Sequence, residues 1–251
     1  MQTALREDIL SEVNAIVRAD KWQGARSCDI VLAPVLAAQL VHECIGHTLE
    51  VDNYNDYGKS AGFSLGCRIS PLPLSVWDDP TRFGHPGSFI YDDKGYRARP
   101  IQLVKDGIVT GILGGTYSDR ARRVSGVVEC LPRMSITWME PCKTQSDSMI
   151  HGIDEGWFCC GTWGGGSIGE TAVLRPAFGQ RIQNGRLTGE FCRRFDIVGL
   201  KRMLVGSIDC IGNDLRLFEP VMGCDKYGQD NLPVSMGAPT IRMRGVELRG
   251  F

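Results

Sequence analysis

Histidine is scarce in this sequence, with four residues in a chain of 251. No run of eighteen consecutive apolar residues occurs, so no membrane span is predicted. The formal net charge of −1 gives no reason to expect nucleic acid as the main partner. The ten cysteines include no CxxC pair, and the N-terminal stretch has no apolar signal region. We therefore expect neither a disulfide framework nor secretion, and predict a cytoplasmic protein.

Two of the histidines, His42 and His47, lie five positions apart, and Glu43 follows the first. A His-Glu pair with a second histidine close by is typical of a zinc site with an acid/base carboxylate. Five residues of an ideal helix leave the two imidazoles about 140° apart. Both can bind one metal only if the helix widens into a π-turn or ends before His47, and Gly46 permits such a distortion. The apolar stretch at residues 34–49 predicts a buried helix around them.

The alternative is that both histidines are ordinary core or cap residues. A charged Glu43 among apolar neighbours is costly to bury, however, unless a cation pairs with it. The metal-site interpretation therefore explains the motif better.

The rest of the chain predicts many strands and few helices. Residues 52–88, rich in Gly, Pro, Asp and Ser, indicate an extended loop with a short strand at 74–77. We expect an α+β fold, with a mainly antiparallel sheet on which the zinc-ligand helix packs. One domain is predicted over residues 1–251, with a helical N-terminal extension at 1–27. The other expected elements are helices at 4–20 and 195–208, strands at 28–33, 135–139, 157–161 and 239–249, and hairpin signals at 88–95, 100–113 and 180–191.

Several short segments carry a family resemblance through their order and spacing. They are HECIGHTLEVD at 42–52, the Asp-Asp segment at 76–79, the hairpin at 90–113, TWGGG at 162–166, the hairpin IQNGRLTG, IGNDL at 211–215 and GCDKYGQ at 223–229. Each is weak alone, but together with the unusual histidine spacing they cover about residues 28–245. The chain resembles the TldD-like catalytic half of the TldD/TldE (PmbA) family of zinc metallopeptidases.

The resemblance implies a third zinc ligand, Cys224, beside His42 and His47. Two imidazoles and one thiolate leave a fourth position open, as in a catalytic zinc site. Such a ligand set suits Zn²⁺ best among the common metals. Glu43 is then expected to act as general base on the zinc-bound water, in a peptidase or amide hydrolase.

The glycines Gly164, Gly165 and Gly166 form either a simple turn or a bare backbone with which a peptide could pair as an added strand. The resemblance favours the second interpretation, because the family holds an extended peptide near the metal. Arg122 and Arg123 are candidates for gripping a substrate carboxylate.

The basic cluster also includes Arg120, and a solvated charge cluster explains it equally well. Glu50, Asp52 and His85 are candidate partners that orient the ligating imidazoles.

The resemblance further implies a longer protein, because family members carry an additional N-terminal domain that helps form a dimer around the active site. Only 27 residues precede the first predicted strand here. The chain thus resembles a version that lacks most of that domain. We expect a homodimer or a heterodimer with a TldE-like homologue, and a peptide or peptide-like substrate. Trimming such a substrate in a biosynthetic pathway is one hypothesis.

Two other functions stay open. A zinc-dependent non-hydrolytic enzyme could use the same site as a base on a small amino-acid-derived metabolite. A non-catalytic partner subunit could bind and present a peptide, although such a subunit has no need of His42, Glu43, His47 and Cys224.

Overall fold

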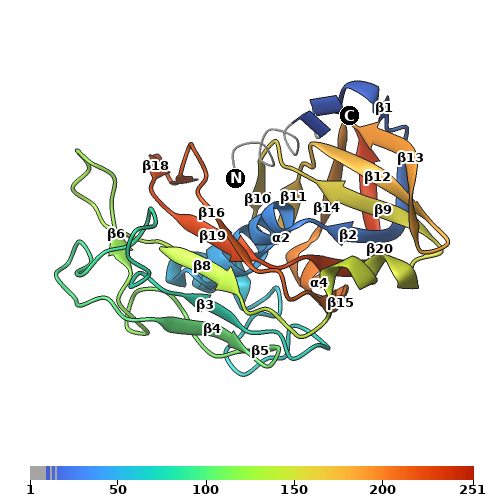
Figure 1. Cartoon of the computed structure of the whole chain (residues 1–251). Helices are drawn as coiled ribbons and strands as arrows, with labels where there is room; N and C mark the ends of the chain where they lie inside the picture. Colours follow the sequence, from blue (N-terminus) through green and yellow to red (C-terminus); the bar gives the residue numbers. More distant parts are fainter. Residues whose placement is uncertain (1–9, 12, 15) are drawn as a thin grey trace.

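The chain folds around one helix that lies between two β-sheets (Figure 1). The computed structural model describes residues 10–11, 13–14 and 16–251. Strands dominate, most neighbours are antiparallel, and the α+β class is confirmed. The central helix, α2 (Pro34–Leu40), begins with proline at its first turn, which suits a position without an N–H partner. Its residues Leu36 to Leu40 are all buried, so the helix forms the core between the sheets.

The larger sheet has ten strands and carries the C-terminal end of the chain (Figure 1). Its long central strands β2 and β20 pair antiparallel, and β2 pairs parallel with β9 on its other side. The tenth strand, β15, also pairs with β20 and is not part of the linear order of the other nine strands. The strands in order are β1 (Asp20–Lys21), β13 (Arg186–Arg193), β12 (Phe178–Gln183), β9 (Glu155–Cys160), β2 (Ala25–Leu32), β20 (Ile241–Gly250), β14 (Phe195–Leu200), β11 (Thr171–Leu174) and β10 (Gly165–Ile168), with β15 at Ile208–Ile211.

The smaller sheet packs on the other side of α2. It has six strands, of which only β8 and β19 pair parallel. Two short hairpins, β6 with β7 and β17 with β18, lie outside both sheets. The strands in order are β16 (Arg216–Phe218), β19 (Ser235–Ala238), β8 (Ile136–Met139), β3 (Val76–Asp78), β4 (Ile101–Lys105) and β5 (Ile108–Val109), and the hairpins comprise β6 (Ala121–Arg122), β7 (Leu131–Pro132), β17 (Cys224–Lys226) and β18 (Gln229–Leu232).

Two of the predicted hairpins are confirmed together with their turns. Asp106 and Gly107 connect β4 to β5, and Asn184 and Gly185 connect β12 to β13. All four residues have positive φ, between 49° and 78°. Two-residue turns of this kind match the twist of antiparallel strands, which explains why Asp-Gly and Asn-Gly predict them well.

One predicted element is wrong, and another is confirmed only in part. Residues 195–208 do not form one helix, because β14 is followed by the short helix α4 (Lys201–Gly206) and then by β15. β14 lies between β11 and β20, and ladder bonds on both sides outweigh its helical propensity. The predicted loop at 52–88 begins with helix: α3 (Val51–Asn53) continues into a π-turn at Tyr54–Gly58. Its expected strand is β3, at Val76–Asp78.

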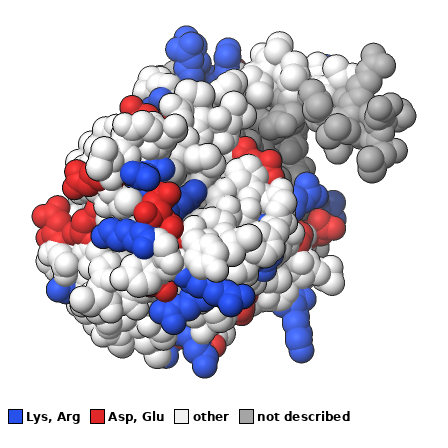
Figure 2. Space-filling model, turned by 90° about the vertical axis from the view of Figure 1, so that its left-hand side faces the viewer, with Lys and Arg blue, Asp and Glu red and all other residues white. Residues whose placement is uncertain are grey.

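The start of the chain follows the prediction only in part. The described positions between 10 and 18 are helical, whereas residues 4–9, 12 and 15 of the expected helix lie outside the described residues. Asp20 and Lys21 form β1 and pair with β13. Within the described ranges, no helix is long and apolar enough to cross a membrane. On the face shown in Figure 2, basic and acidic side chains lie next to one another.

Candidate metal centre

The structure brings together the three residues expected to bind zinc. One ligand atom from each of His42, His47 and Cys224 lies within 4.8 Å of the others. The Sγ atom of Cys224 is 3.4 Å from Nε2 of His47, and the two imidazole rings meet edge to face at 4.8 Å between centroids. Two of the residues come from the central helix and the third from the first position of β17, 177 positions from His47.

The helix widens between His42 and His47, which are five positions apart. α2 continues without a break into a π-turn at Val41–Gly46, after which His47–Leu49 form one turn of 3₁₀-helix. The wider turn brings the fifth residue onto the same side as the first, which a regular α-helix cannot do. A Cβ atom on Gly46 would overlap the Sδ atom of Met134, so any larger residue here would require the Met134 side chain to move. The bulge predicted from the sequence is therefore present, but Gly46 has ordinary helical dihedral angles (φ −55°, ψ −63°), so its role here is packing rather than backbone freedom.

One donor-to-donor distance in the cluster matches a zinc site. Zinc bonds of about 2.3 Å to sulfur and 2.05 Å to nitrogen place the two donors of a tetrahedral site about 3.5 Å apart. The observed 3.4 Å between Sγ and Nε2 matches that edge. In addition, Nδ1 of His42 is enclosed and finds no hydrogen-bond partner within the described part of the chain. A bound metal would satisfy this atom, which is otherwise one of several unpaired buried polar atoms in the described residues.

The charged neighbours of Cys224 favour its thiolate form. Burial opposes ionisation of Cys224, but the neighbouring imidazoles of His42 and His47 outweigh it and lower the pKa of the thiol to about 5. Burial likewise opposes protonation of His47, yet the Glu50 carboxylate and the Cys224 sulfur raise the pKa of its imidazole to about 10. The thiolate is the form of cysteine that binds metals.

Glu50 orients one of the imidazoles. Its carboxylate lies 2.9 Å from Nδ1 of His47, which directs Nε2 towards Cys224. The same carboxylate accepts hydrogen bonds from Nζ of Lys226 and from the backbone N–H of Met134. Burial opposes its ionisation, but His47 and Lys226 lower its pKa to about 2. Such an outer carboxylate fixes the tautomer of a metal-binding histidine.

The other two candidates for orienting an imidazole, Asp52 and His85, do not hydrogen-bond to His42 or His47. Asp52 accepts a hydrogen bond from Lys226 at 2.6 Å and so supports Glu50 indirectly. His85 pairs with Glu219 at 3.2 Å on the surface and does not join the cluster.

Glu43 lies beside the ligands with its carboxylate uncommitted. Its side chain is 8% exposed, and it makes no hydrogen bond or ion pair with any other described residue. A buried carboxylate without a direct partner is costly, and the neighbouring charge of Lys201 offsets part of that cost. The arrangement leaves the oxygens of Glu43 available to a water molecule or substrate.

The glycines of the Thr-Trp-Gly-Gly-Gly segment lead into an edge strand. Gly165 and Gly166 begin β10, whose outer side has no neighbouring strand in the described structure. β10 contacts the π-turn that carries His42. Gly165 sits against Nε2 of Gln39, 2.6 Å from where its Cβ would be, whereas Gly166 faces open space.

The three arginines of the basic cluster differ in their surroundings. Arg120 is fully buried and pairs with Asp78 at 2.6 Å. Arg122 is also buried and donates to the backbone carbonyls of Met134 and Pro233, and burial lowers its pKa to about 10. Arg123 is exposed.

Two residues near the site, Lys226 and Arg133, were not predicted from the sequence. Lys226 lies two positions after Cys224 in β17, and alternation along a strand places both on one face. That spacing was a usable signal. Arg133 is fully buried and donates to the backbone carbonyl of Cys224. Nothing local in the sequence marks this contact, because the two residues are 91 positions apart.

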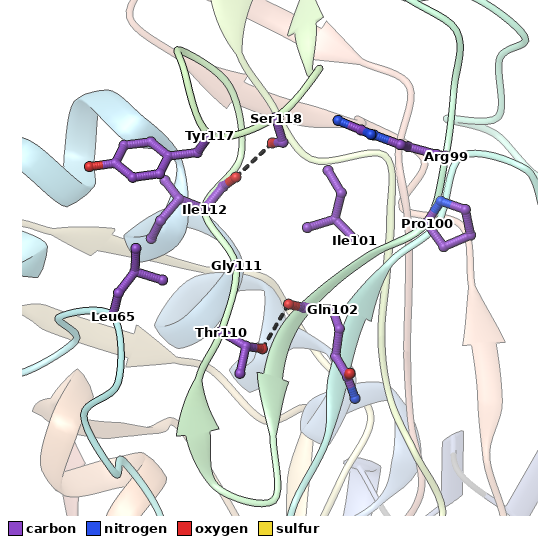
Figure 3. A pocket seen from close by; sticks show the side chains of 10 residues that line it. All are labelled: Leu65, Arg99, Pro100, Ile101, Gln102, Thr110, Gly111, Ile112, Tyr117 and Ser118. Atoms are coloured by element: carbon purple, nitrogen blue, oxygen red, sulfur yellow. Dashed lines mark hydrogen bonds between the residues drawn. The ribbon is translucent and has the colours of Figure 1, made fainter.

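A separate hollow of about 340 Å³ lies beside β4 and β5 (Figure 3). Two hydroxyl groups that line it already donate hydrogen bonds to other lining residues: Thr110 to the carbonyl of Gln102, and Ser118 to that of Ile112. None of the three candidate metal ligands lines it. The metal cluster is therefore the stronger candidate for chemistry.

Comparison with known proteins agrees with this geometry. The family profile described as the PmbA/TldA metallopeptidase C-terminal domain matches residues 25–250. A metalloprotease of Synechocystis sp. is 31% identical over 231 residues, covering 88% of this chain and 50% of the relative. A protein of Saccharolobus solfataricus named as a zinc metalloprotease TldD homolog is 28% identical, covering 88% of this chain and 51% of its own length.

Solved structures share the fold. TldE from Thermococcus kodakarensis superimposes with a TM-score of 0.69 at 18% identity, over 91% of this chain and 51% of its own. A protein of Bacteroides thetaiotaomicron described as a putative modulator of DNA gyrase gives 0.70 at 20% identity, over 98% and 52%. The chain spans about half the length of the curated relatives it matches.

Proposed function

The chain belongs to the PmbA/TldA metallopeptidase C-terminal domain family, and on that premise we propose that it is a zinc-dependent peptidase or amide hydrolase. The observation that carries the proposal is the buried cluster of His42, His47 and Cys224 with the unpaired carboxylate of Glu43 beside it. Two imidazoles and one thiolate suit a catalytic zinc site, since they leave one coordination position for a reactant.

Each protein group has a distinct task in this proposal. His42, His47 and Cys224 would hold the metal, and Glu50 keeps His47 in the required tautomer. A zinc ion in such a site supplies Lewis acidity that makes water nucleophilic at neutral pH and polarises a carbonyl group. Glu43 accepts the proton of the attacking water and delivers it to the nitrogen that leaves.

The edge strand β10 supports an extended substrate. The backbone groups of β10 that do not face β11 can pair with a peptide, and β10 contacts the π-turn that carries His42. Gly164 precedes it with a positive φ of 104° and allows the chain to turn onto the edge. Binding of a substrate carboxylate by Arg122 and Arg123 stays a prediction. Both guanidinium groups also donate to backbone carbonyls, Arg122 to Met134 and Pro233 and Arg123 to Val127 and Val128, although only Arg123 is exposed.

The proposal extends to a partner. The curated relatives are about twice as long as the matched region, and a TldE structure shares this fold. We infer that a second subunit, a copy of this chain or a TldE-like protein, completes the enclosure of the site. A role in trimming a peptide within a biosynthetic pathway stays a prediction.

Metal content tests the proposal first. We expect about one zinc per chain in wild-type protein purified without chelators or a histidine tag, and a large loss in Cys224→Ser. Glu43→Gln should keep its zinc but lose turnover of peptide substrates, because the metal ligands stay intact while the base is gone. Little metal in the wild type, or zinc-loaded wild type that binds peptides without cleaving them, would favour the peptide-presenting subunit instead, whereas full turnover in Glu43→Gln would rule out Glu43 as the base.

A further inference from the structure

Lys201 is a fully buried lysine without a carboxylate partner among the described residues. Its Nζ donates a hydrogen bond to the hydroxyl oxygen of Tyr57 at 2.9 Å and lies 4.6 Å from the centre of the same ring. Buried charges are usually paired with an opposite charge or hydrogen-bonded fully. A lone phenol as the partner of a buried ammonium group therefore needs an explanation.

The Lys201–Tyr57 pair lies where the metal helix meets the edge strand. Lys201 begins α4, which packs against the π-turn bearing His42, and its backbone N–H donates to the carbonyl of Glu170 in the turn after β10. Tyr57 belongs to the π-turn at Tyr54–Gly58, which packs on the 3₁₀ turn of His47. The pair is thus joined to both parts of the proposed site.

The charges around the pair keep the phenol a hydrogen-bond donor. Burial raises the pKa of the Tyr57 hydroxyl well above its ordinary value; the Thr48 hydroxyl opposes this, and Glu50 and Asp52 add to it. Since Lys201 already donates to the hydroxyl oxygen, the hydroxyl proton is directed elsewhere. Tyr57 is half-buried, whereas Lys201 is fully buried. Burial lowers the pKa of Lys201, and the neighbouring Cys44, Glu43 and Glu50 oppose that effect.

We propose that Tyr57 is a further catalytic residue, whose hydroxyl donates a hydrogen bond to the carbonyl oxygen of the scissile amide, and that Lys201 is the residue that positions it. The inference rests on the proposed hydrolase function. During hydrolysis the water oxygen bonds to the carbonyl carbon and the C–N bond breaks, while Glu43 carries the proton from water to the amine. Tyr57 keeps its proton and stabilises the negative charge that develops on the carbonyl oxygen.

A cobalt-loaded protein allows a test that does not depend on a known substrate. Full-length protein loaded with Co²⁺ is titrated with acetohydroxamate, whose carbonyl oxygen stands in for that of the amide, and binding is followed by the visible absorption of the metal. Tyr57→Phe should retain its cobalt and weaken acetohydroxamate binding about tenfold, as expected for one lost hydrogen bond to a charged group. Tyr54→Phe is the matched control, because its hydroxyl in the same π-turn accepts from the backbone N–H of Leu65.

A double-mutant cycle separates positioning from general support of the fold. If Lys201 acts through Tyr57, Lys201→Met weakens acetohydroxamate binding, and the double variant loses no more than Tyr57→Phe alone. With a cleavable peptide, Tyr57→Phe should lower kcat by roughly 100-fold with little change in KM.

Unchanged acetohydroxamate affinity in Tyr57→Phe overturns the proposal, and this single variant decides even if Lys201→Met does not fold. Wild-type protein that binds acetohydroxamate through Tyr57 but cleaves no peptide refutes the hydrolase function and leaves the hydrogen bond established.

Discussion

Lys226 and Glu50 form an enclosed ion pair, with 2.9 Å between Nζ and a carboxylate oxygen. Glu50 also contacts Nδ1 of His47, and Lys226 lies in the same short strand as Cys224. The pair therefore joins the helix that carries the imidazoles to the hairpin that carries the thiol. Two segments that are far apart in the sequence are held in register at the metal cluster by this charge contact.

Removal of the lysine should loosen this connection. In Lys226→Met the Glu50 carboxylate loses its cationic partner and is left buried beside His47, so we expect zinc affinity to fall about 10- to 100-fold. Competition with a chelating dye measures the change. Lys143→Met serves as the control, because Lys143 is exposed. A variant at position 226 that binds zinc as tightly as the wild type would show that the hairpin is held by other contacts.

A second prediction concerns the buried pair of Arg120 and Asp78. Both side chains are fully enclosed and lie 2.6 Å apart, and Asp78 also accepts hydrogen bonds from Ser135 and Thr137. Arg120→Met leaves an uncompensated buried carboxylate, so the free energy of unfolding should fall by about 3–5 kcal/mol. Urea denaturation followed by circular dichroism measures it.

The neighbouring exposed arginine provides the comparison for that prediction. Arg123→Met should change the free energy of unfolding by no more than about 0.5 kcal/mol, because the side chain is exposed. Equal effects at positions 120 and 123 would contradict the assignment of Arg120 to the core.

The sequence predicted those elements that depend on neighbouring residues. The Asp106-Gly107 and Asn184-Gly185 turns require positive φ at both centres, and short-range chemistry alone supplies that signal. The distortion between His42 and His47 was predictable too, since helix periodicity forbids their convergence otherwise. Residues 195–208 failed because their state depends on two neighbouring strands that the local pattern does not reveal.

The site shows the same division. The His-Glu motif is recognisable from its local spacing, whereas Cys224 was assigned only through resemblance. Arg133 contacts Cys224 through one hydrogen bond between residues that are distant in the sequence. The Lys201–Tyr57 bond spans 144 positions, and the wrongly expected helix at 195–208 concealed the place where α4 begins. Residues that support a site from distant parts of the chain leave no spacing to detect.

The glycines of β10 allow a third prediction with a built-in comparison. A Cβ atom on Gly165 would meet Nε2 of Gln39 and the carbonyl oxygen of Val173, each at 2.6 Å, whereas Gly166 faces open space. Gly165→Ala should therefore lower the free energy of unfolding by about 1–3 kcal/mol through overpacking. Gly166→Ala should leave it nearly unchanged. Equal melting temperatures for the two variants would show that β10 shifts freely on the metal helix.

The fourth prediction concerns acid stability and the ion cluster of Asp209. Its carboxylate accepts hydrogen bonds from Arg242 at 2.8 Å and from Arg244 at 2.7 Å. Partial burial opposes its ionisation, but the two arginines outweigh it, so the pKa of Asp209 lies below its ordinary value. A carboxyl group with a lowered pKa in the folded state stabilises the protein fully above the unfolded value of about 3.9. That contribution is lost as the pH falls through the folded pKa.

Asp209→Asn should therefore be less stable than the wild type at neutral pH, and the difference should shrink in acid. Urea denaturation of both proteins at pH 7 and at several values below about pH 4 tests this. Asp147→Asn is a suitable control, because Asp147 is exposed. The interpretation fails if the stability gap between Asp209→Asn and the wild type stays constant across that range, since the lost stability would then come from packing rather than from the charge of Asp209.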